Sequence, residues 1–213
     1  FELKYIVMDP GYAPKNRELI EENIKTLGID AEIFTSDIFD VAYSAGGSPC
    51  YLCARMRRGA LYAKAKSLDC NKIALGHHFD DVIETLLMSM LYSSEIKTML
   101  PKLHSTNFEG MELIRPLYKV KERDVISWAN YNDLHFLRCA CKFTADSAED
   151  EKLSKRQEMK QLVKTLRQTN PDADNNIFRS LHNVNMATIP GWRDSDSGEK
   201  HSFIENYENL KEE

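Results

Sequence analysis

Four of the five cysteines in this 213-residue chain lie in two pairs, and thiolates spaced in this way can do chemistry. Cys50 and Cys53 are separated by two residues, whereas Cys139 and Cys141 follow much later and are separated by one. Because the number of cysteines is odd, the pairs favour a metal site or a redox role over a disulfide scaffold. Zinc, an iron–sulfur cluster and thiol exchange all remain open at this point. Cys70, which stands alone, is interpreted as a small buried thiol.

A basic run follows the first cysteine pair directly. Arg55, Arg57 and Arg58 all lie within five residues of Cys53. Fixed positive charge favours the thiolate form, and it can also neutralise the phosphates of a nucleotide or a nucleic acid. A solvated helix face is the alternative interpretation. The formal net charge of −5 argues against nucleic-acid binding by the whole surface, but it leaves room for a local basic face.

Residues 76–81 read Gly-His-His-Phe-Asp-Asp and stand between a predicted strand and a predicted helix. Ligands of open α/β sheets bind at the carboxyl ends of the strands. Gly76 lets a ligand approach the backbone, and the helix N-terminus favours phosphate. Asp80 and Asp81 could then hold Mg²⁺ against that phosphate. The alternative is that the two aspartates only stabilise the start of the helix.

The apolar pattern places these residues in an alternation of strands and helices. Residues 3–8 predict a buried strand, and Pro14 opens a helix that Gly28 closes. The later elements continue the order, with strands at 31–35 and 72–75, helices at 51–68, 79–91 and 122–131, and a hairpin between 102 and 117. Such alternation predicts an α/β fold in which helices cover both faces of a parallel sheet, followed by C-terminal helices.

Composition and pattern also predict how the chain is divided. We expect a domain at residues 1–145, a helical extension at 146–190 and a tail at 191–213. The extension is polar and helical from about residue 149 to 184, and its basic side chains either meet RNA phosphates or form a solvated face. No apolar run is long enough to span a bilayer, and the first residues lack the features of a signal peptide. We therefore expect a cytoplasmic protein with no membrane partner.

Two motifs together resemble a known family. Residues 76–85 (GHHFDDVIET) resemble the GHxxDDxxET motif of the N-type ATP pyrophosphatases, or PP-loop proteins. Around them, residues 49–62 (PCYLCARMRRGALY), residues 114–117 (IRPL) and Cys139 occur in the order typical of the tRNA 2-thiocytidine synthetase family. The resemblance covers roughly residues 3–145. It implies an adenine nucleotide alpha hydrolase-like, Rossmann-like fold.

The resemblance implies ATP-dependent thiolation of tRNA. In this family ATP adenylates the carbonyl of cytidine 32, pyrophosphate leaves, and sulfur then displaces AMP. The implied cofactors are ATP, Mg²⁺ and a [4Fe-4S] cluster held by Cys50, Cys53 and Cys139. The family has a CxxC at the later position where this chain reads Cys-Ala-Cys, so Cys141 is an alternative third ligand. The implied partners are tRNA and a sulfur-donor system, and a homodimer is possible.

The resemblance also implies roles for individual residues. The first predicted strand ends at Met8, where the adenine of the family's nucleotide lies, and Arg115 precedes a proline at the end of a strand-like run. The predicted catalytic residues are Asp80, Asp81 and Arg57. The predicted nucleotide-binding residues are Met8, Gly76, His77, Arg58 and Arg115.

The phosphate-binding loop of the family, SGGxDS, has no match in the sequence. Residues 44–48 (SAGGS) lack the aspartate and run into Pro49 instead of a helix. The first strand of the chain corresponds to the second strand of the family. Because that loop supplies the main cradle for pyrophosphate, we expect the chain to be part of a longer enzyme and, as it stands, to turn over ATP poorly.

Two other functions are compatible with the same residues. A different PP-loop sulfurtransferase would make 2-thiouridine or act on a small molecule. A binding module without turnover would use its thiolates for zinc or a cluster, and a tetrahedral zinc site could use all four paired cysteines. Iron and sulfide content separates a cluster from zinc, and analysis of tRNA nucleosides separates the two sulfurtransferases.

Overall fold

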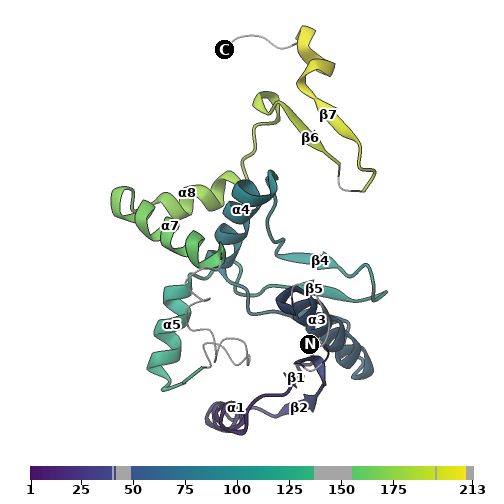
Figure 1. The fold of residues 1–213 in the computed structure, drawn as a ribbon, viewed down its shortest axis with the longest axis vertical. Helices are drawn as coiled ribbons and strands as arrows, with labels where there is room; N and C mark the ends of the chain where they lie inside the picture. Colours follow the sequence, from purple (N-terminus) through teal and green to yellow (C-terminus); the bar gives the residue numbers. More distant parts are fainter. Residues whose placement is uncertain (40, 42–48, 137–154, 195, 210–213) are drawn as a thin grey trace.

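The computed structural model describes residues 1–39, 41, 49–136, 155–194 and 196–209, and it begins with a strand–helix–strand unit (Figure 1). Strand β1 (Tyr5–Asp9) and strand β2 (Ala31–Thr35) pair in parallel, with helix α1 (Pro14–Leu27) between them in the chain. Pro14 lies in the first turn of α1, and Gly28 ends it in the left-handed conformation with φ of 62°. The predicted start and end of this helix are therefore confirmed.

A second sheet carries the Gly-His-His turn. Strand β3 (Lys72–Ala74) pairs in parallel with β5 (Glu112–Ile114), and β4 (Lys102–His104) pairs antiparallel with β5. The predicted hairpin is thus the β4–β5 connection. Helix α4 (Phe79–Ser93) follows β3, and α5 (Glu122–Tyr131) follows β5. The α/β class with parallel strands is confirmed, but the described strands form separate sheets because none of them pairs with both β1 and β3.

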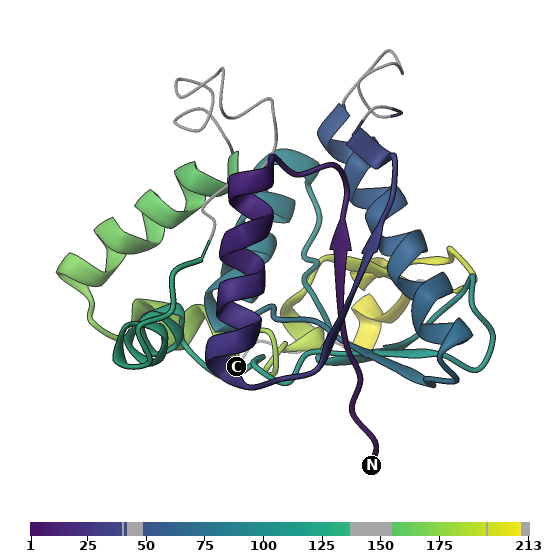
Figure 2. The same ribbon diagram turned by 90° about the horizontal axis from the view of Figure 1, so that it is seen from below.

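Helix α3 (Pro49–Ser67) covers both sheets. Tyr62 and Ala65 of α3 join a buried cluster with Ile73 of β3 and Leu113 of β5, and Ile6 of β1 packs against the same cluster. The ring of Tyr62 also stacks on Phe108, with centroids 4.9 Å apart. Helices α1 and α3 lie on either side of the β1–β2 pair (Figure 2). Apolar packing under α3 therefore joins strands that share no hydrogen bonds.

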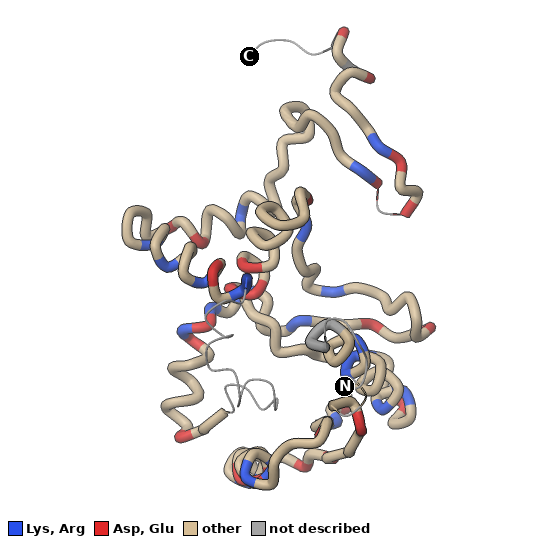
Figure 3. The backbone as a smooth tube through the Cα atoms, in the orientation of Figure 1, with Lys and Arg blue, Asp and Glu red and all other residues tan. Residues whose placement is uncertain are grey.

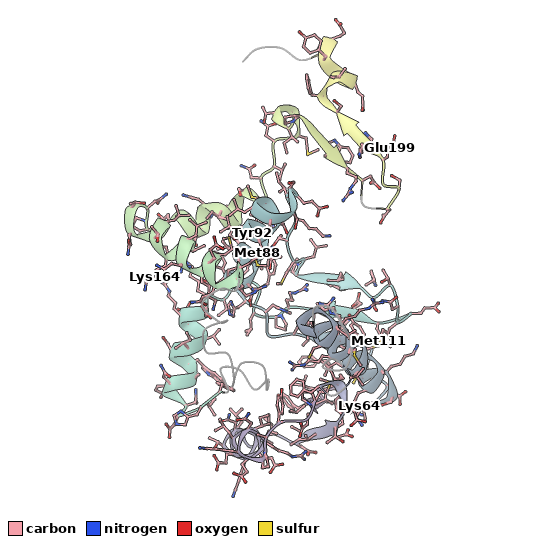
Figure 4. All side chains as sticks on the ribbon, in the orientation of Figure 1. Lys64, Met88, Tyr92, Met111, Lys164 and Glu199 are labelled. Atoms are coloured by element: carbon pink, nitrogen blue, oxygen red, sulfur yellow. The ribbon has the colours of Figure 1, made fainter. Side chains whose placement is uncertain are left out.

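The C-terminal helices complete a second core around α4. Helix α7 (Lys155–Thr169) and helix α8 (Ala173–Ser180) bring Val163 and Phe178 against Phe79, Val82 and Ile83. Tyr92 lies at the far end of α4 (Figure 4). Its hydroxyl donates to Glu158, and Lys155 Nζ lies 4.4 Å from the centroid of its ring. The extension therefore shares a core with the α/β part.

Two helices, α7 and α8, form the described part of the predicted helical extension, and the second ends at Ser180, a little before the expected residue 184. Pro171 separates α7 from α8, and a proline has no amide to continue the helical hydrogen bonds. The amides of Asp172 and Ala173 instead donate to Asn170, at 3.1 Å to its side-chain oxygen and 3.0 Å to its carbonyl. This turn folds α8 back onto α4.

Residues 191–209 form more structure than the predicted tail. Strands β6 (Gly191–Arg193) and β7 (Lys200–Ser202) form a hairpin, the short helix η2 (Met186–Thr188) precedes it, and η3 (Phe203–Asn209) follows it. The rings of Trp192 and His201 stack across the hairpin with centroids 4.0 Å apart. The hairpin extends away from the other elements (Figure 1), and Arg193 bonds Glu95 at the end of α4 at 2.9 Å.

Two carboxylates on α4 are buried where α4 meets α7. Glu84 has a relative exposure of 2% and Asp80 of 8%. Arg156 Nη1 bonds Glu84 at 2.9 Å, and Arg167 Nη2 bonds Asp80 at 2.7 Å. Acidic and basic positions consequently gather between α4, α5 and α7 (Figure 3). Because a buried carboxylate is costly without a partner, these charges specify how α7 docks.

The pKa of Glu84 rises to about 7, chiefly because burial disfavours the charged carboxylate. The charges of Lys160 and Arg156 on α7 and the hydrogen bond from Arg156 act in the opposite direction, and Asp81 adds to the rise. A carboxylate with this pKa is partly protonated at neutral pH.

None of the helices in the described residues has both the length and the apolar character needed to cross a bilayer.

The apolar core around α4 is tested by Ile83→Ala. Ile83 is fully buried, so its truncation should lower the free energy of unfolding by roughly 2–5 kcal/mol in urea denaturation. Leu91→Ala removes an exposed leucine of the same helix and should cost less than about 0.5 kcal/mol. Equal losses in the two variants would contradict the core described above.

The buried carboxylate is tested by Glu84→Gln. Since the pKa of Glu84 is higher in the folded chain than the usual 4.5, its proton stabilises the fold below about pH 4.5, and this stabilisation is lost as pH rises through 7. The fall in the free energy of unfolding between pH 5 and pH 8 should therefore be smaller in Glu84→Gln than in the unmodified protein, by up to roughly 3 kcal/mol. Urea denaturation at both pH values measures this. The exposed Glu18→Gln controls for loss of a carboxylate, and an unchanged fall in Glu84→Gln would refute the assignment.

Candidate active site

Reciprocal hydrogen bonds at the start of α4 stabilise the turn that follows β3. The amide of His78 donates to Asp81 Oδ2 at 3.0 Å, and the amide of Asp81 donates to His78 Nδ1 at 3.4 Å. This capping box satisfies two amides that a helix start otherwise leaves unpaired. On the strand side, the amide of Leu75 donates to the carbonyl of Ile114. Gly76 and Arg115 therefore leave the ends of two paired strands together.

A positively charged site forms at these strand ends. His77 comes from the turn, Arg115 follows β5, and Arg58 comes from α3. The pKa of His77 is lowered mainly by burial. The charge of Asp81 raises this pKa, whereas the charges of three arginines lower it further, namely Arg115, Arg156 and Arg58. Burial also lowers the pKa of Arg115, and the charge of Arg58 adds to the effect. The structure thus brings together three of the predicted nucleotide-binding residues, and the lowered pKa favours the neutral form of His77.

Two buried polar atoms of this site have no hydrogen-bond partner in the described part of the chain. They are Nδ1 of His77 and Nε of Arg115. The Nη1 group of Arg115 donates to the carbonyl of Leu100, which fixes the guanidinium beside the turn. A buried polar atom without a partner costs free energy that a bound ligand can recover. The two cations and these atoms therefore favour an anion as the ligand.

The two adjacent aspartates of the motif have different surroundings. Asp80 accepts from the amide of Glu122 at 2.7 Å and from Arg167 at 2.7 Å, so each of its oxygens is used inside the protein. Asp80 borders a cavity of about 210 Å³ between α4 and α7 that Lys160 also lines. Asp81 instead interacts electrostatically with both His77 and Arg115. The structure therefore places Asp81 with the positively charged site, and Asp80 at the junction of three helices.

The acidic groups do not converge on a metal position within the described residues, where no three or more His, Cys, Asp or Glu side chains are grouped for one. Asp81 Oδ2 is engaged by the amide of His78 and its Oδ1 by Arg156 at 2.9 Å. The predicted Mg²⁺ ligation by Asp80 and Asp81 thus stays a prediction.

The end of β1 is a turn stabilised by hydrogen bonds to the side chain of Asp9. Met8 is buried and pairs in register with Phe34 of β2. Asp9 Oδ1 accepts from the amides of Gly11 and Tyr12 at 2.9 and 2.8 Å, and these bonds lower the pKa of Asp9 although its burial raises it. Met8 belongs to the β1–β2 sheet, so no described strand pairing links it to the turn that carries His77.

The cysteines are described only in part. Cys53 is half-buried on α3 and Cys50 lies in the first turn of the same helix, but the side chain of Cys50 lies outside the described residues. Cys139 and Cys141 also lie outside them. Arg57 is exposed on α3, a helix whose charged residues are all basic. Cys70 has its Sγ 3.8 Å from the carbonyl of Leu68, which supports a structural role.

Three partly exposed basic residues of α7 pair with carboxylates of the neighbouring helices, which pattern alone did not reveal. They are Arg156, Lys160 and Arg167, which bond Glu84, Glu122 and Asp80. Their spacing of four and seven residues places them on one helix face and is the available signal. Each of these three side chains is therefore paired with a carboxylate. The sequence predicted instead that the basic residues of this segment contact RNA or face solvent.

Comparison with known proteins supports the same fold. A family model described as a PP-loop domain matches residues 13–166. Among solved structures, the chain is similar to a U34-tRNA thiolase, NcsA from Methanococcus maripaludis, with its [4Fe-4S] cluster. It superposes with a TM-score of 0.64 at 20% identity over 84% of this chain, and this chain spans 60% of the length of that one.

Curated relatives are more similar in sequence. A tRNA-cytidine(32) 2-sulfurtransferase of Geobacter sulfurreducens is 35% identical over 189 residues, covering 86% of this chain and 70% of the relative. The protein of the same name from Geotalea uraniireducens is 36% identical over 188 residues, covering 86% and 72%. The matched PP-loop domain and these identities establish that the chain belongs to the PP-loop family, in the group of the tRNA-cytidine(32) 2-sulfurtransferases.

Proposed function

We propose that the protein is an ATP-dependent tRNA sulfurtransferase that replaces a carbonyl oxygen of a base, cytidine 32, with sulfur. The observation that supports this most is the positively charged site of His77, Arg58 and Arg115 beside Asp81, at the carboxyl ends of β3 and β5. It is the position at which open α/β sheets bind nucleotides. The names of the curated relatives point to the same reaction.

Helix α3 carries residues of both halves of the proposed chemistry. Arg58 of the positively charged site and Cys53 lie on the same helix, five residues apart. Five residues advance a helix by about 7.5 Å and turn it by about 140°, so the two side chains leave different faces of α3. In the proposal the activated base therefore lies at the first turns of α3, between the nucleotide on one face and the thiols on another.

The first step of the proposed mechanism is adenylation. The base carbonyl oxygen attacks the α-phosphorus of ATP, the bond to the β-phosphate oxygen breaks, and pyrophosphate leaves with the electron pair. Arg58 and Arg115 would neutralise charge that builds up on the phosphates. Neutral His77 can accept a hydrogen bond from the ligand through Nδ1, or donate one, according to its tautomer. Asp81 and Arg57 are proposed to orient the reacting groups, and Asp80 to support them from the helix junction.

The second step is displacement of AMP by sulfur. A [4Fe-4S] cluster held by Cys50, Cys53 and Cys139, or by Cys141 in place of Cys139, would supply the sulfur when bound. The environment of Cys53 fits such a group, because it is half-buried on a helix whose charged residues are all positive and would balance the charge of thiolates. Soft thiolates are the ligands that iron–sulfur clusters require.

Further parts of the proposal follow from the chemistry. Mg²⁺ would accompany the ATP phosphates, and Gly76 and Met8 would contact the nucleotide. The tRNA would meet exposed basic residues of α3, and a separate sulfur-donor system would restore the sulfur.

The exposed Trp192, Ile204 and Tyr207 would suit a homodimer contact. Residues 1–145 would supply the catalytic domain, the helices to 190 its support and 191–213 an appendage, in the cytoplasm where tRNA is modified.

Nucleoside analysis tests the function directly. A strain from which the gene is deleted should lose 2-thiocytidine from its tRNA and regain it when the intact gene is returned. Persistence of 2-thiocytidine with loss of another thionucleoside would refute the cytidine assignment. The native protein purified without oxygen should contain iron and sulfide, and a colourless protein with one zinc would exclude the cluster.

Substitution of a cluster ligand should separate the two steps. We expect Cys53→Ser to abolish thiolation while leaving the Kd for ATP within about threefold of the unmodified protein, because the thiol acts after nucleotide binding. Cys70→Ser is the matched control, since Cys70 lies outside the proposed site, and it should retain activity. Thiolated nucleosides and nucleotide titration measure the two effects. Equal loss of both in Cys53→Ser would point to a structural role.

Substitution in the positively charged site should weaken nucleotide binding. Arg115→Gln removes one of two neighbouring cations that would contact the phosphates, and we expect the Kd for ATP to rise about tenfold. The control is Arg123→Gln, which changes an exposed arginine that pairs with Asp124. This variant should leave the Kd for ATP unchanged. Isothermal titration with ATP measures both, and unaltered binding in Arg115→Gln would contradict the site.

A further inference from the structure

Arg156 makes an unusual set of contacts with the motif on α4. Its Nη1 donates to Asp81 Oδ1 and to Glu84 Oε2, each at 2.9 Å, and its Nη2 lies 3.5 Å from Thr85 Oγ1. All three acceptors belong to the Gly-His-His motif stretch, whereas Arg156 comes from the first turn of α7, more than seventy residues later. One guanidinium thus ties three polar groups of the motif together.

The buried Glu84 explains why Arg156 stays in this position. The side chain of Glu84 is only 3% exposed, while that of Arg156 is 39% exposed. A nearly buried carboxyl group keeps its hydrogen-bond donor, because separation would leave a buried polar oxygen without a partner. Glu84 therefore fixes the guanidinium, and the fixed guanidinium can act on its other partner, Asp81.

Asp81 is held at both carboxylate oxygens. Oδ2 accepts from the amide of His78, and Oδ1 accepts from Arg156. The plane of the carboxylate is thus set by two donors from different elements, next to the positively charged site that contains His77 and Arg115. Without Arg156, Oδ1 of Asp81 would lose its donor, and among the described residues His78 would be left to orient the carboxylate.

Docking of α7 does not depend on Arg156 alone. Met159 and Val163 of α7 are buried, and Val163 packs in the core around Phe79. Lys160 bonds Glu122 at 2.6 Å, and Arg167 bonds Asp80 and Asp174 at 2.7 and 2.8 Å. The helix therefore has other anchors, and Arg156 is the one directed at Asp81.

We propose that Arg156 is a positioning residue for the reaction, which acts by fixing the carboxylate of Asp81 in the orientation it presents to the bound nucleotide. This inference rests on the proposed function. Arg156 touches no reacting group in this arrangement, since both of its terminal nitrogens are directed at protein oxygens. Its effect belongs to the chemical step, where small errors in orientation are costly, and not to the binding of ATP.

The test compares Arg156→Lys and Arg156→Gln in the native full-length enzyme. We expect kcat for tRNA thiolation to fall about tenfold in Arg156→Lys, since an amine keeps the charge near Glu84 but loses the planar bridge, and about a hundredfold in Arg156→Gln. The KM for ATP should stay within about threefold. The control is Lys121→Gln, which removes a cation from another nearly buried carboxylate, Asp174, away from Asp81. It should retain the kcat of the folded protein.

A second measurement does not need activity. Amide hydrogen exchange at His78 reports the bond to Asp81 Oδ2, and we expect it to be about tenfold faster in Arg156→Gln and unchanged in Lys121→Gln. Unaltered kcat and exchange in Arg156→Gln would overturn the inference, as would equal changes in both variants. A change confined to the KM for ATP would mean that Arg156 contacts the nucleotide. If the unmodified enzyme thiolates no tRNA, the proposed function fails, while exchange at His78 still decides whether Arg156 orients Asp81.

Discussion

The burial of two carboxylates on one face of α4 is the constraint on which the rest of the structure depends. Asp80 and Glu84 are almost inaccessible to water, and a charged carboxylate in that position requires donors from outside its own helix. Arg156 and Arg167 come from α7, and the amide of Glu122 comes from the start of α5. Since each bond has a defined direction, these groups set how three helices meet. Apolar packing alone would tolerate more arrangements.

The same constraint shapes the candidate active site. The start of α4 is fixed by its capping box and by the bond from the amide of Phe79 to the carbonyl of Val120, so His77 and Asp81 have defined positions at the strand ends. Arg58 approaches from α3 and Arg115 from the end of β5, and the charge of Arg58 lowers the pKa of Arg115 in addition to the effect of burial. Neighbouring cations, together with buried polar atoms that have no partner among the described residues, form a place that favours an anion.

Much of the fold could be predicted because its signals are local. Pro14 and Gly28 mark the ends of α1, the bounds predicted for α5 agree with the structure, and the Gly-His-His turn lies between β3 and α4 as expected. The partners of Asp80 could not be predicted, because Arg167 is 87 residues away and its basic character fits a solvated helix equally well. The hairpin of β6 and β7 is stabilised by the stacking of Trp192 on His201, a contact that no periodicity indicates. Separation in sequence, more than residue type, limited the predictions.

The position of α3 determines how the candidate active site responds to unfolding. Tyr62 and Ala65 of this helix are buried with Ile73 and Leu113, and the same helix carries Arg58 and Cys53. Displacing α3 would therefore expose the apolar cluster beneath it, at a cost comparable to that of opening the core itself. This part of the molecule is consequently not expected to unfold locally at a low cost in free energy. Proposed sulfur delivery and phosphate binding then belong to one cooperative unit, so they persist together in the native state and disappear together when it unfolds.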